Sequence, residues 1–172
     1  RDQERMGVLV AELQHRVRNI LAGVRSVFFR TAQNPESLEE LAEHFKRRLG
    51  SLARTQVIVT QSGDGIVNLE DLIREELLSA GVSDGALLTL EGPEVDVPSG
   101  AAETLGLAIH ELTTNAVKYG AIGSTGGKLI IRWSINLDYS GERRLLLTWQ
   151  EEGVSALSLK PTRQGFGTEL IK

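Results

Sequence analysis

The chain of 172 residues contains no cysteine, only four prolines, and aromatic residues at 5% of the total. Without cysteine it forms no disulfide, performs no thiol chemistry and builds no zinc site that needs thiolate ligands. Its three histidines, His15, His44 and His110, lie too far apart in sequence to form a local metal motif. No run of 18 apolar residues is present, so we expect neither a membrane-spanning helix nor a signal peptide. We therefore expect an intracellular, cytoplasmic protein.

The chain also lacks an excess of positive charge. It carries 19 Lys and Arg against 23 Asp and Glu, a formal net charge of -4. This balance excludes DNA binding through charge alone and argues against nucleic acid and anionic membrane surfaces as main partners. With 41% apolar and 24% charged residues, the composition is that of a globular protein of one or two domains. Helical patterns run into both ends, so we expect a fragment of a longer protein.

Two long helices are predicted in the N-terminal part. Residues 2–32 contain no proline, and apolar residues recur there at three- and four-residue steps. Ser37 and Glu40 form a capping box that opens a second helix at about 37–60. Two long helices joined by a short loop form an antiparallel hairpin. Because this hairpin cannot bury both apolar stripes alone, a second copy or another domain should cover what remains.

The loop Gln61–Gly65 predicts a boundary between a helical hairpin at 1–61 and a second domain at 66–172. In the second domain, Asn68 or Asp71 can cap a helix at about 69–80. A strand is expected at 86–90.

Ser99 is expected to cap a helix that runs to about Tyr119 and ends at Gly120. Residues 128–137 alternate between apolar and polar and should pair with 144–150 as a β-hairpin. The predicted fold class is therefore α+β, a two-helix hairpin followed by an α/β sandwich with helices on one face of a sheet.

His15 is the first candidate functional residue. At about 100° per residue, the apolar stripe of its helix projects roughly 140° to 220° away from it, so His15 should face solvent. Arg16, Arg18 and Asn19 follow it and would suit an anionic group or an acidic partner. The alternative is an ordinary surface histidine, which is how we interpret His44.

A second candidate site lies on the helix that begins at Ser99. Glu111, Asn115 and Lys118 fall within roughly 60° of one another on a face distinct from the apolar one. A carboxylate, a carboxamide oxygen and an ammonium at this spacing can serve a hydrated Mg²⁺ and the phosphates that it bridges. The alternative is a solvated polar face with an incidental Glu-Lys pair.

Two further segments fit a nucleotide site. Trp149 and Glu151 share parity with the buried residues of their strand, so Glu151 can accept a hydrogen bond from an exocyclic amine such as that of adenine. Gly165, Gly167 and Thr168 precede a helical start, where backbone amides favour phosphate. Taken alone, the glycine segment could equally be a plain loop.

Together these blocks resemble the HWE subfamily of bacterial sensor histidine kinases over essentially the whole chain. His15–Asn19 looks like the phosphoacceptor box, and Ala108–Ala121 like the N box with the subfamily's histidine, His110. Trp149–Glu151 is similar to the Trp-x-Glu block, and Gly165–Ile171 to the second glycine box.

The resemblance implies a phosphoacceptor and dimerisation hairpin followed by a Bergerat-type ATP-binding domain. It implies that His15 accepts the γ-phosphoryl group, that Asn115 coordinates Mg²⁺, and that Glu111 polarises the histidine or holds a Mg²⁺-bound water. The residues that it assigns to the ATP site are His110, Asn115, Lys118, Tyr119, Trp149, Glu151, Gly153, Gly165, Gly167 and Thr168. The sequence does not give the chemical role of His110.

The leading hypothesis is a histidine kinase that uses Mg²⁺ and ATP to phosphorylate itself on His15 and then passes the phosphoryl group to an aspartate of a response-regulator receiver domain. One alternative is a histidine phosphotransfer protein with a vestigial ATP domain, which Val154 favours because the family commonly has glycine there. Another is an ATPase of the same fold without histidine chemistry. We expect an upstream sensor domain and a homodimer, with a monomer as the alternative.

Overall fold

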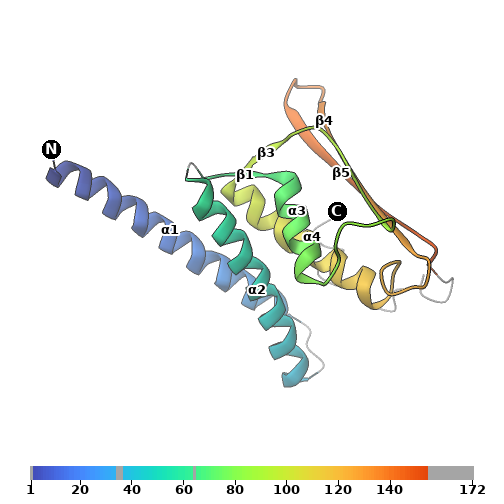
Figure 1. Ribbon diagram of the computed structural model, residues 1–172. Helices are drawn as coiled ribbons and strands as arrows, with labels where there is room; N and C mark the ends of the chain where they lie inside the picture. Colours follow the sequence, from blue (N-terminus) through green and yellow to red (C-terminus); the bar gives the residue numbers. More distant parts are fainter. Residues whose placement is uncertain (1, 34–36, 64, 155–172) are drawn as a thin grey trace.

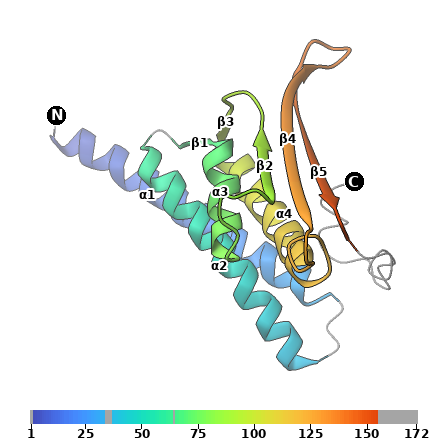
Figure 2. The same cartoon turned by 45° about the vertical axis from the view of Figure 1, so that its right-hand side comes forward.

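The computed structural model describes residues 2–33, 37–63 and 65–154, and Figure 1 shows their arrangement. The structure has three layers: the helical hairpin α1–α2, the pair of helices α3 and α4, and a sheet (Figures 1 and 2). The described elements, in chain order, are α1 (Asp2–Thr31), α2 (Leu38–Ser62), β1 (Ile66–Asn68), α3 (Leu69–Ser79), β2 (Leu88–Glu91), β3 (Asp96–Pro98), α4 (Ser99–Lys118), β4 (Lys128–Leu137) and β5 (Arg143–Glu152).

Both helices of the predicted hairpin are present, and the predicted cap of α2 is confirmed. Ser37 is the N-cap residue, and its hydroxyl accepts a hydrogen bond from the backbone N–H of Glu40 at 3.1 Å. Among the described residues, other elements cover α1 in its C-terminal part, where Val27 is buried. The N-terminal part projects beyond the other layers (Figure 1).

A three-stranded sheet in the order β2-β4-β5 forms the outer layer. β2 runs parallel to β4, and β4 pairs antiparallel with β5, with Ile131 opposite Trp149 and Leu129 opposite Glu151. The predicted β-hairpin is therefore confirmed. Alternate residues of β4 and β5 point towards α3 and α4, which lie against one face of the sheet (Figure 2). The observed fold is α+β, as predicted.

Two features of the second layer differ from the sequence prediction. β1 and β3 pair antiparallel as a separate two-stranded ribbon, which the sequence pattern did not predict. Ser99 does not cap α4, because the N-cap residue is Pro98, which makes no side-chain cap. The backbone N–H of Ser99 instead donates to the carbonyl of Gly65 at 3.0 Å, so the end of the β1–β3 ribbon starts this helix.

One apolar core joins α2 to the later elements. Val59 of α2 belongs to the same buried cluster as Leu72 of α3, Ile109 of α4 and Ile131 of β4. Domain boundaries at 1–61 and 66–172 remain a prediction, and the structure adds that the C-terminal half of α2 packs directly on α4. None of the helices in the described residues is both long enough and apolar enough to cross a membrane.

Candidate functional site

α4 carries three of the predicted site residues on one side. Its buried stripe, which includes Ala102, Ile109 and Ala116, faces the core and leaves Asn115 and Lys118 exposed near its C-terminal end. Tyr119, the C-cap residue, is 65% exposed. A carboxamide and an ammonium are thus both open to a ligand from solvent.

Glu111, the third member of this face, is not open in the same way. Its carboxylate accepts a hydrogen bond from Arg48 Nε of α2 at 2.7 Å, and the two side chains are only 18% and 8% exposed. Arg48 Nη1 also donates to the hydroxyl of Thr31, at the end of α1, at 2.9 Å. Arg48 was not predicted as a site residue, because in the sequence it cannot be distinguished from its neighbour Arg47 on a helix rich in charge. The contact links all three helices.

Trp149 and Glu151 lie on the core-facing side of β5, as the parity predicted. One carboxylate oxygen of Glu151 accepts the indole N–H of Trp149 at 3.0 Å, and the other accepts the backbone N–H of Ala121 at 2.7 Å. The side chain therefore ties β5 to the loop that follows α4. Each carboxylate oxygen can accept a further hydrogen bond, so recognition of adenine by Glu151 stays a prediction.

The loop between α4 and β4 approaches β5 closely at glycines. A Cβ on Gly120 would come 1.9 Å from the Glu151 carboxylate, and one on Gly127 would come 1.9 Å from the carbonyl oxygen of Ala121. Gly153 has a φ of 74° and would bring a Cβ within 3.0 Å of the Gly126 carbonyl oxygen. The residues predicted to cradle the phosphates, Gly165, Gly167 and Thr168, lie outside the described residues.

His15 is exposed on α1, as predicted. Asn19, one turn further on, has its amide nitrogen 3.4 Å from His15 Nδ1, and Arg16 pairs with Glu12 at 2.8 Å. Thr31 lies sixteen positions after His15 in the same continuous helix, a rise of roughly 24 Å. Because Thr31 marks the level of Arg48 and Glu111, the arrangement does not bring His15 to the exposed face of α4.

His110 is buried at the junction of α2, α3 and α4. Its Nδ1 lies 3.1 Å from the carboxylate of Glu76, which is itself fully buried. Burial alone would raise the pKa of the Glu76 carboxyl, but hydrogen bonds from His110 and Arg54 and the charge of Arg54 hold that pKa below its usual value. Glu76 and Arg54 were not predicted as site residues.

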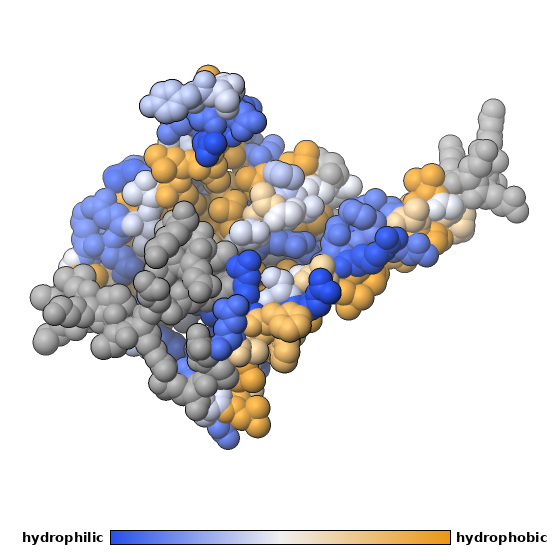
Figure 3. All heavy atoms as spheres, turned by 180° about the vertical axis from the view of Figure 1, so that it is seen from behind, coloured by the Kyte–Doolittle hydropathy of each residue, from blue (hydrophilic) through white to orange (hydrophobic). Residues whose placement is uncertain are grey.

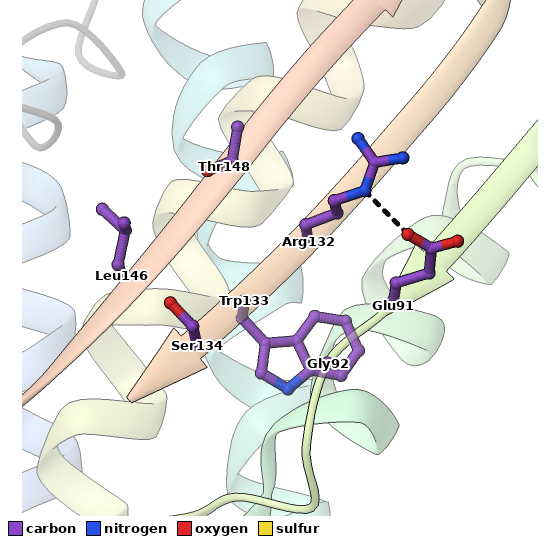
Figure 4. A pocket seen from close by; sticks show the side chains of 7 residues that line it. All are labelled: Glu91, Gly92, Arg132, Trp133, Ser134, Leu146 and Thr148. Atoms are coloured by element: carbon purple, nitrogen blue, oxygen red, sulfur yellow. Dashed lines mark hydrogen bonds and ion pairs between the residues drawn. The ribbon is translucent and has the colours of Figure 1, made fainter. Parts of the chain in front are cut away.

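A surface pocket lies elsewhere, on the face of the sheet turned away from α4 (Figure 4). Arg132 pairs there with Glu91 at 2.7 Å, and the indole of Trp133 occupies the space beside Gly92, where a Cβ would come within 2.3 Å of the ring. None of the predicted site residues lines this pocket. In the described ranges, no group of three or more His, Asp or Glu side chains is placed to hold a metal ion.

The sequence model of the HWE histidine kinase family matches residues 12–94. A blue-light-activated histidine kinase of Brucella anthropi is 30% identical over 164 residues, which are 95% of this chain and 33% of the relative. The chain is therefore similar to HWE histidine kinases along nearly its whole length. The matched segment includes His15, whereas Glu111, Asn115 and Glu151 lie beyond it.

Other similar proteins carry the same description. Blue-light-activated histidine kinase 1 of Erythrobacter litoralis is 30% identical over 167 residues, which are 95% of this chain and 45% of that protein. The chain thus spans less than half the length of these curated relatives. A solved structure of an Erythrobacter litoralis blue-light-activated histidine kinase is 18% identical and covers 94% of this chain and 53% of its own, with a TM-score of 0.48.

Proposed function

We propose that this chain is the kinase core of a sensor histidine kinase, in which Mg²⁺ and ATP support phosphorylation of His15 and the phosphoryl group then passes to an aspartate of a response-regulator receiver domain. The observation that carries the proposal is an exposed imidazole on α1 inside the segment matched by the HWE histidine kinase family. We also propose that the signal reaches α1 from a sensor domain that precedes it in the longer protein.

The donor set on α4 fits Mg²⁺-ATP. Asn115 offers one exposed carboxamide oxygen, a hard ligand of the kind that Mg²⁺ prefers, and Mg²⁺ usually takes its other ligands from water and substrate phosphates. Lys118, one turn later, offers an exposed cation for a phosphate. The bound metal would neutralise phosphate charge. Tyr119, Trp149, Glu151 and Gly153 are assigned to the adenine end, and Gly165, Gly167 and Thr168 to the phosphates.

The chain's own contribution to the chemistry is a neutral imidazole. A ring nitrogen of His15 forms the bond to the γ-phosphorus while the bond from phosphorus to the bridging oxygen breaks, ADP leaves, and the imidazole gives up one N–H proton. Phosphoryl transfer asks little covalent help of a protein, so positioning and charge neutralisation carry it. Since His15 lies roughly 24 Å along α1 from the level of Glu111, transfer requires α1 and α4 to shift or a second copy to supply one of them.

We propose that a second copy covers the apolar side of α1. Leu13 is 62% exposed and Val17 46%, and Figure 3 shows apolar atoms along one side of the projecting part of the helix. Leu13→Lys should shift the sedimentation profile from dimer to monomer. The control is Val8→Lys, because Val8 is 70% exposed but lies on the His15 side of the helix. A parent that is monomeric at all concentrations would favour the monomer alternative.

The decisive experiment is incubation of the chain with γ-labelled ATP and Mg²⁺. The parent and His44→Ala should take up label, and His15→Ala should take up none while still binding ATP. The label should be lost in acid and kept in alkali, as a phosphoramidate is. Label in His15→Ala, or label that survives acid, would exclude the kinase assignment. Uptake only from a phosphorylated receiver would favour the phosphotransfer alternative.

A further inference from the structure

A buried charged cluster joins the hairpin to the two helices behind it. At its centre is the carboxylate of Glu76 in α3, which is fully buried. Ser51 Oγ donates to one of its oxygens at 2.9 Å, and Arg54 Nη2 donates to the other at 2.8 Å, both from α2. His110 Nδ1 of α4 lies 3.1 Å from that second oxygen. Three helices therefore meet on one carboxylate.

The contacts of His110 determine which nitrogen of its ring carries the hydrogen. A carboxylate with a depressed pKa is ionised and only accepts hydrogen bonds, so Nδ1 carries the hydrogen and donates it to Glu76. The 3.3 Å contact between Arg54 Nη2 and the same Nδ1 then joins two donors and is not a hydrogen bond. The other ring nitrogen, Nε2, is buried and has no hydrogen-bond partner among the described residues. The described contacts of the ring thus run to Glu76 alone.

The cluster lies on a stripe of α2 that is in close contact with α4. Thr55, one turn after Ser51, is buried against Gly106 of α4. A Cβ on Gly106 would come 2.6 Å from the Thr55 hydroxyl. Gln56 Nε2 donates to Glu103 at 2.5 Å on the same side. A buried carboxylate is costly unless it keeps its partners. Rotation or sliding of α2 would separate Ser51 and Arg54 from Glu76, so the cluster favours one setting of α2 against α4.

We propose that His110 and Glu76 are positioning residues for phosphorylation of His15, holding the hairpin at a fixed setting against the helix that carries Asn115. This rests on the proposed kinase function. It gives the histidine of the family's N box a role in holding α2, separate from contact with ATP. His110 acts through Glu76, and Glu76 acts through Ser51 and Arg54 of the hairpin.

The test separates nucleotide binding from phosphorylation. In His110→Ala and Glu76→Gln, the affinity for Mg²⁺-ATP, measured by titration calorimetry, should stay within about twofold of the parent. The rate of His15 labelling at saturating ATP should fall at least about tenfold. His110→Asn should recover part of the rate, because its amide nitrogen can replace Nδ1 as donor to Glu76. His44→Ala is the matched histidine control, and its rate should not change.

A direct readout of the helix setting is available because the chain has no cysteine of its own. Spin labels on Ala53→Cys in α2 and Thr104→Cys in α4, both exposed positions, should give one narrow distance distribution by pulsed electron paramagnetic resonance. That distribution should broaden or shift when His110→Ala or Glu76→Gln is added, and return towards the parent with His110→Asn. This readout does not depend on kinase activity.

Three results would overturn the proposal. They are a loss of ATP affinity that accounts for the whole loss of rate, an unchanged rate, and an unchanged distance distribution in folded variants. If His110→Ala does not fold, as judged by circular dichroism, Glu76→Gln and His110→Asn decide the question. A parent chain that takes no label would defeat the proposed function instead, and the distance distribution would still decide the positioning role.

Discussion

The carboxylate of Glu151 accepts the backbone N–H of Ala121 at 2.7 Å, so a side chain at the end of β5 holds the loop that follows α4. Ala121 is 1% exposed, and its N–H would be left without this partner if the carboxylate moved away. Glu151 thereby fixes the loop next to Asn115 and Lys118. This contact and the proposed recognition of adenine involve the same side chain, so variants must separate them.

Gly120→Ala tests the contact without altering Glu151. Its Cβ would lie 1.9 Å from the carboxylate and 2.8 Å from Ala116 Cα, so Glu151 must give way and the buried N–H loses its acceptor. We expect a loss of about 1–3 kcal/mol in the free energy of unfolding, measured with urea. Gly100→Ala, in the first turn of α4 and with no atom within 4 Å of the new Cβ, should leave stability equal or raise it by about 0.4–1 kcal/mol. Equal stability of both variants would contradict the prediction.

Glu151→Ala should reduce the preference for ATP over GTP. Loss of the carboxylate leaves the adenine amine without an acceptor, whereas the contacts to Mg²⁺ and phosphate persist. We expect the preference to shrink about tenfold, equivalent to about 1.4 kcal/mol, in competition titrations with the two nucleotides. Should Gly120→Ala alone reproduce the loss, Glu151 would act through the loop and not on the base.

Asn115→Ala should abolish labelling of His15 and weaken the binding of Mg²⁺-ATP, while the fold stays intact. The side chain is exposed, so its removal opens no cavity, but it takes away the one carboxamide oxygen assigned to the metal. We expect at least about tenfold weaker binding by calorimetry, with the residual affinity no longer sensitive to chelation of Mg²⁺. Thr104→Ala is the control, since Thr104 is an exposed polar residue at the other end of α4. Unchanged affinity in Asn115→Ala would remove the assignment.

The β4–β5 turn should make stability depend on pH through Asp138. Hydrogen bonds from the Ser140 hydroxyl, the Arg144 side chain and the Glu142 backbone lower the pKa of its carboxyl from 3.8 to about 2. A depressed pKa means that the stabilisation is fully present above the unfolded value and is lost as pH falls from about 3.8 through about 2. Asp138→Asn should therefore melt below the parent at pH 7, with a gap that closes towards pH 2. A gap independent of pH would show that the charge is not involved.

Helices and strands were predicted well where the alternation of apolar and polar residues in the sequence matches the alternation of buried and exposed residues in the structure. Residues 128–137 alternate between apolar and polar, and β4 has those same bounds. A strand that packs one face on the core has its apolar side chains at every second position, so the pattern is visible in the sequence. The cap at Ser37 was predicted for a similar reason, since its partner Glu40 is three residues away. β1 and β3 are three residues each and exist only through pairing with one another across the 27 residues between Asn68 and Asp96, so no local pattern predicts them.

The charged contacts were harder to predict than the exposed site residues. His15, Asn115 and Lys118 are exposed as expected, because an amphipathic helix separates its polar face in the sequence itself. Other charged residues surround Arg48, Arg54 and Glu76 on their helices. The sequence does not distinguish a charged side chain that another element buries from one that stays in solvent. Only the packing of α2 on α4 distinguishes them. The same packing gives Glu111 a basic partner that the sequence analysis had not expected.

The shared core also limits where this chain can be cut or fused. Val59 is buried among residues of α3, α4 and β4, so the last turns of α2 belong to the core of the C-terminal part of the chain. A chimera that exchanged the whole hairpin at Gln61–Gly65 would replace these core residues of α2. One that crosses over within α1 or the first turns of α2, before Arg48, keeps them. Exchange of segments with related proteins should therefore succeed upstream of Arg48 and fail at the loop Gln61–Gly65, the boundary that the sequence predicts.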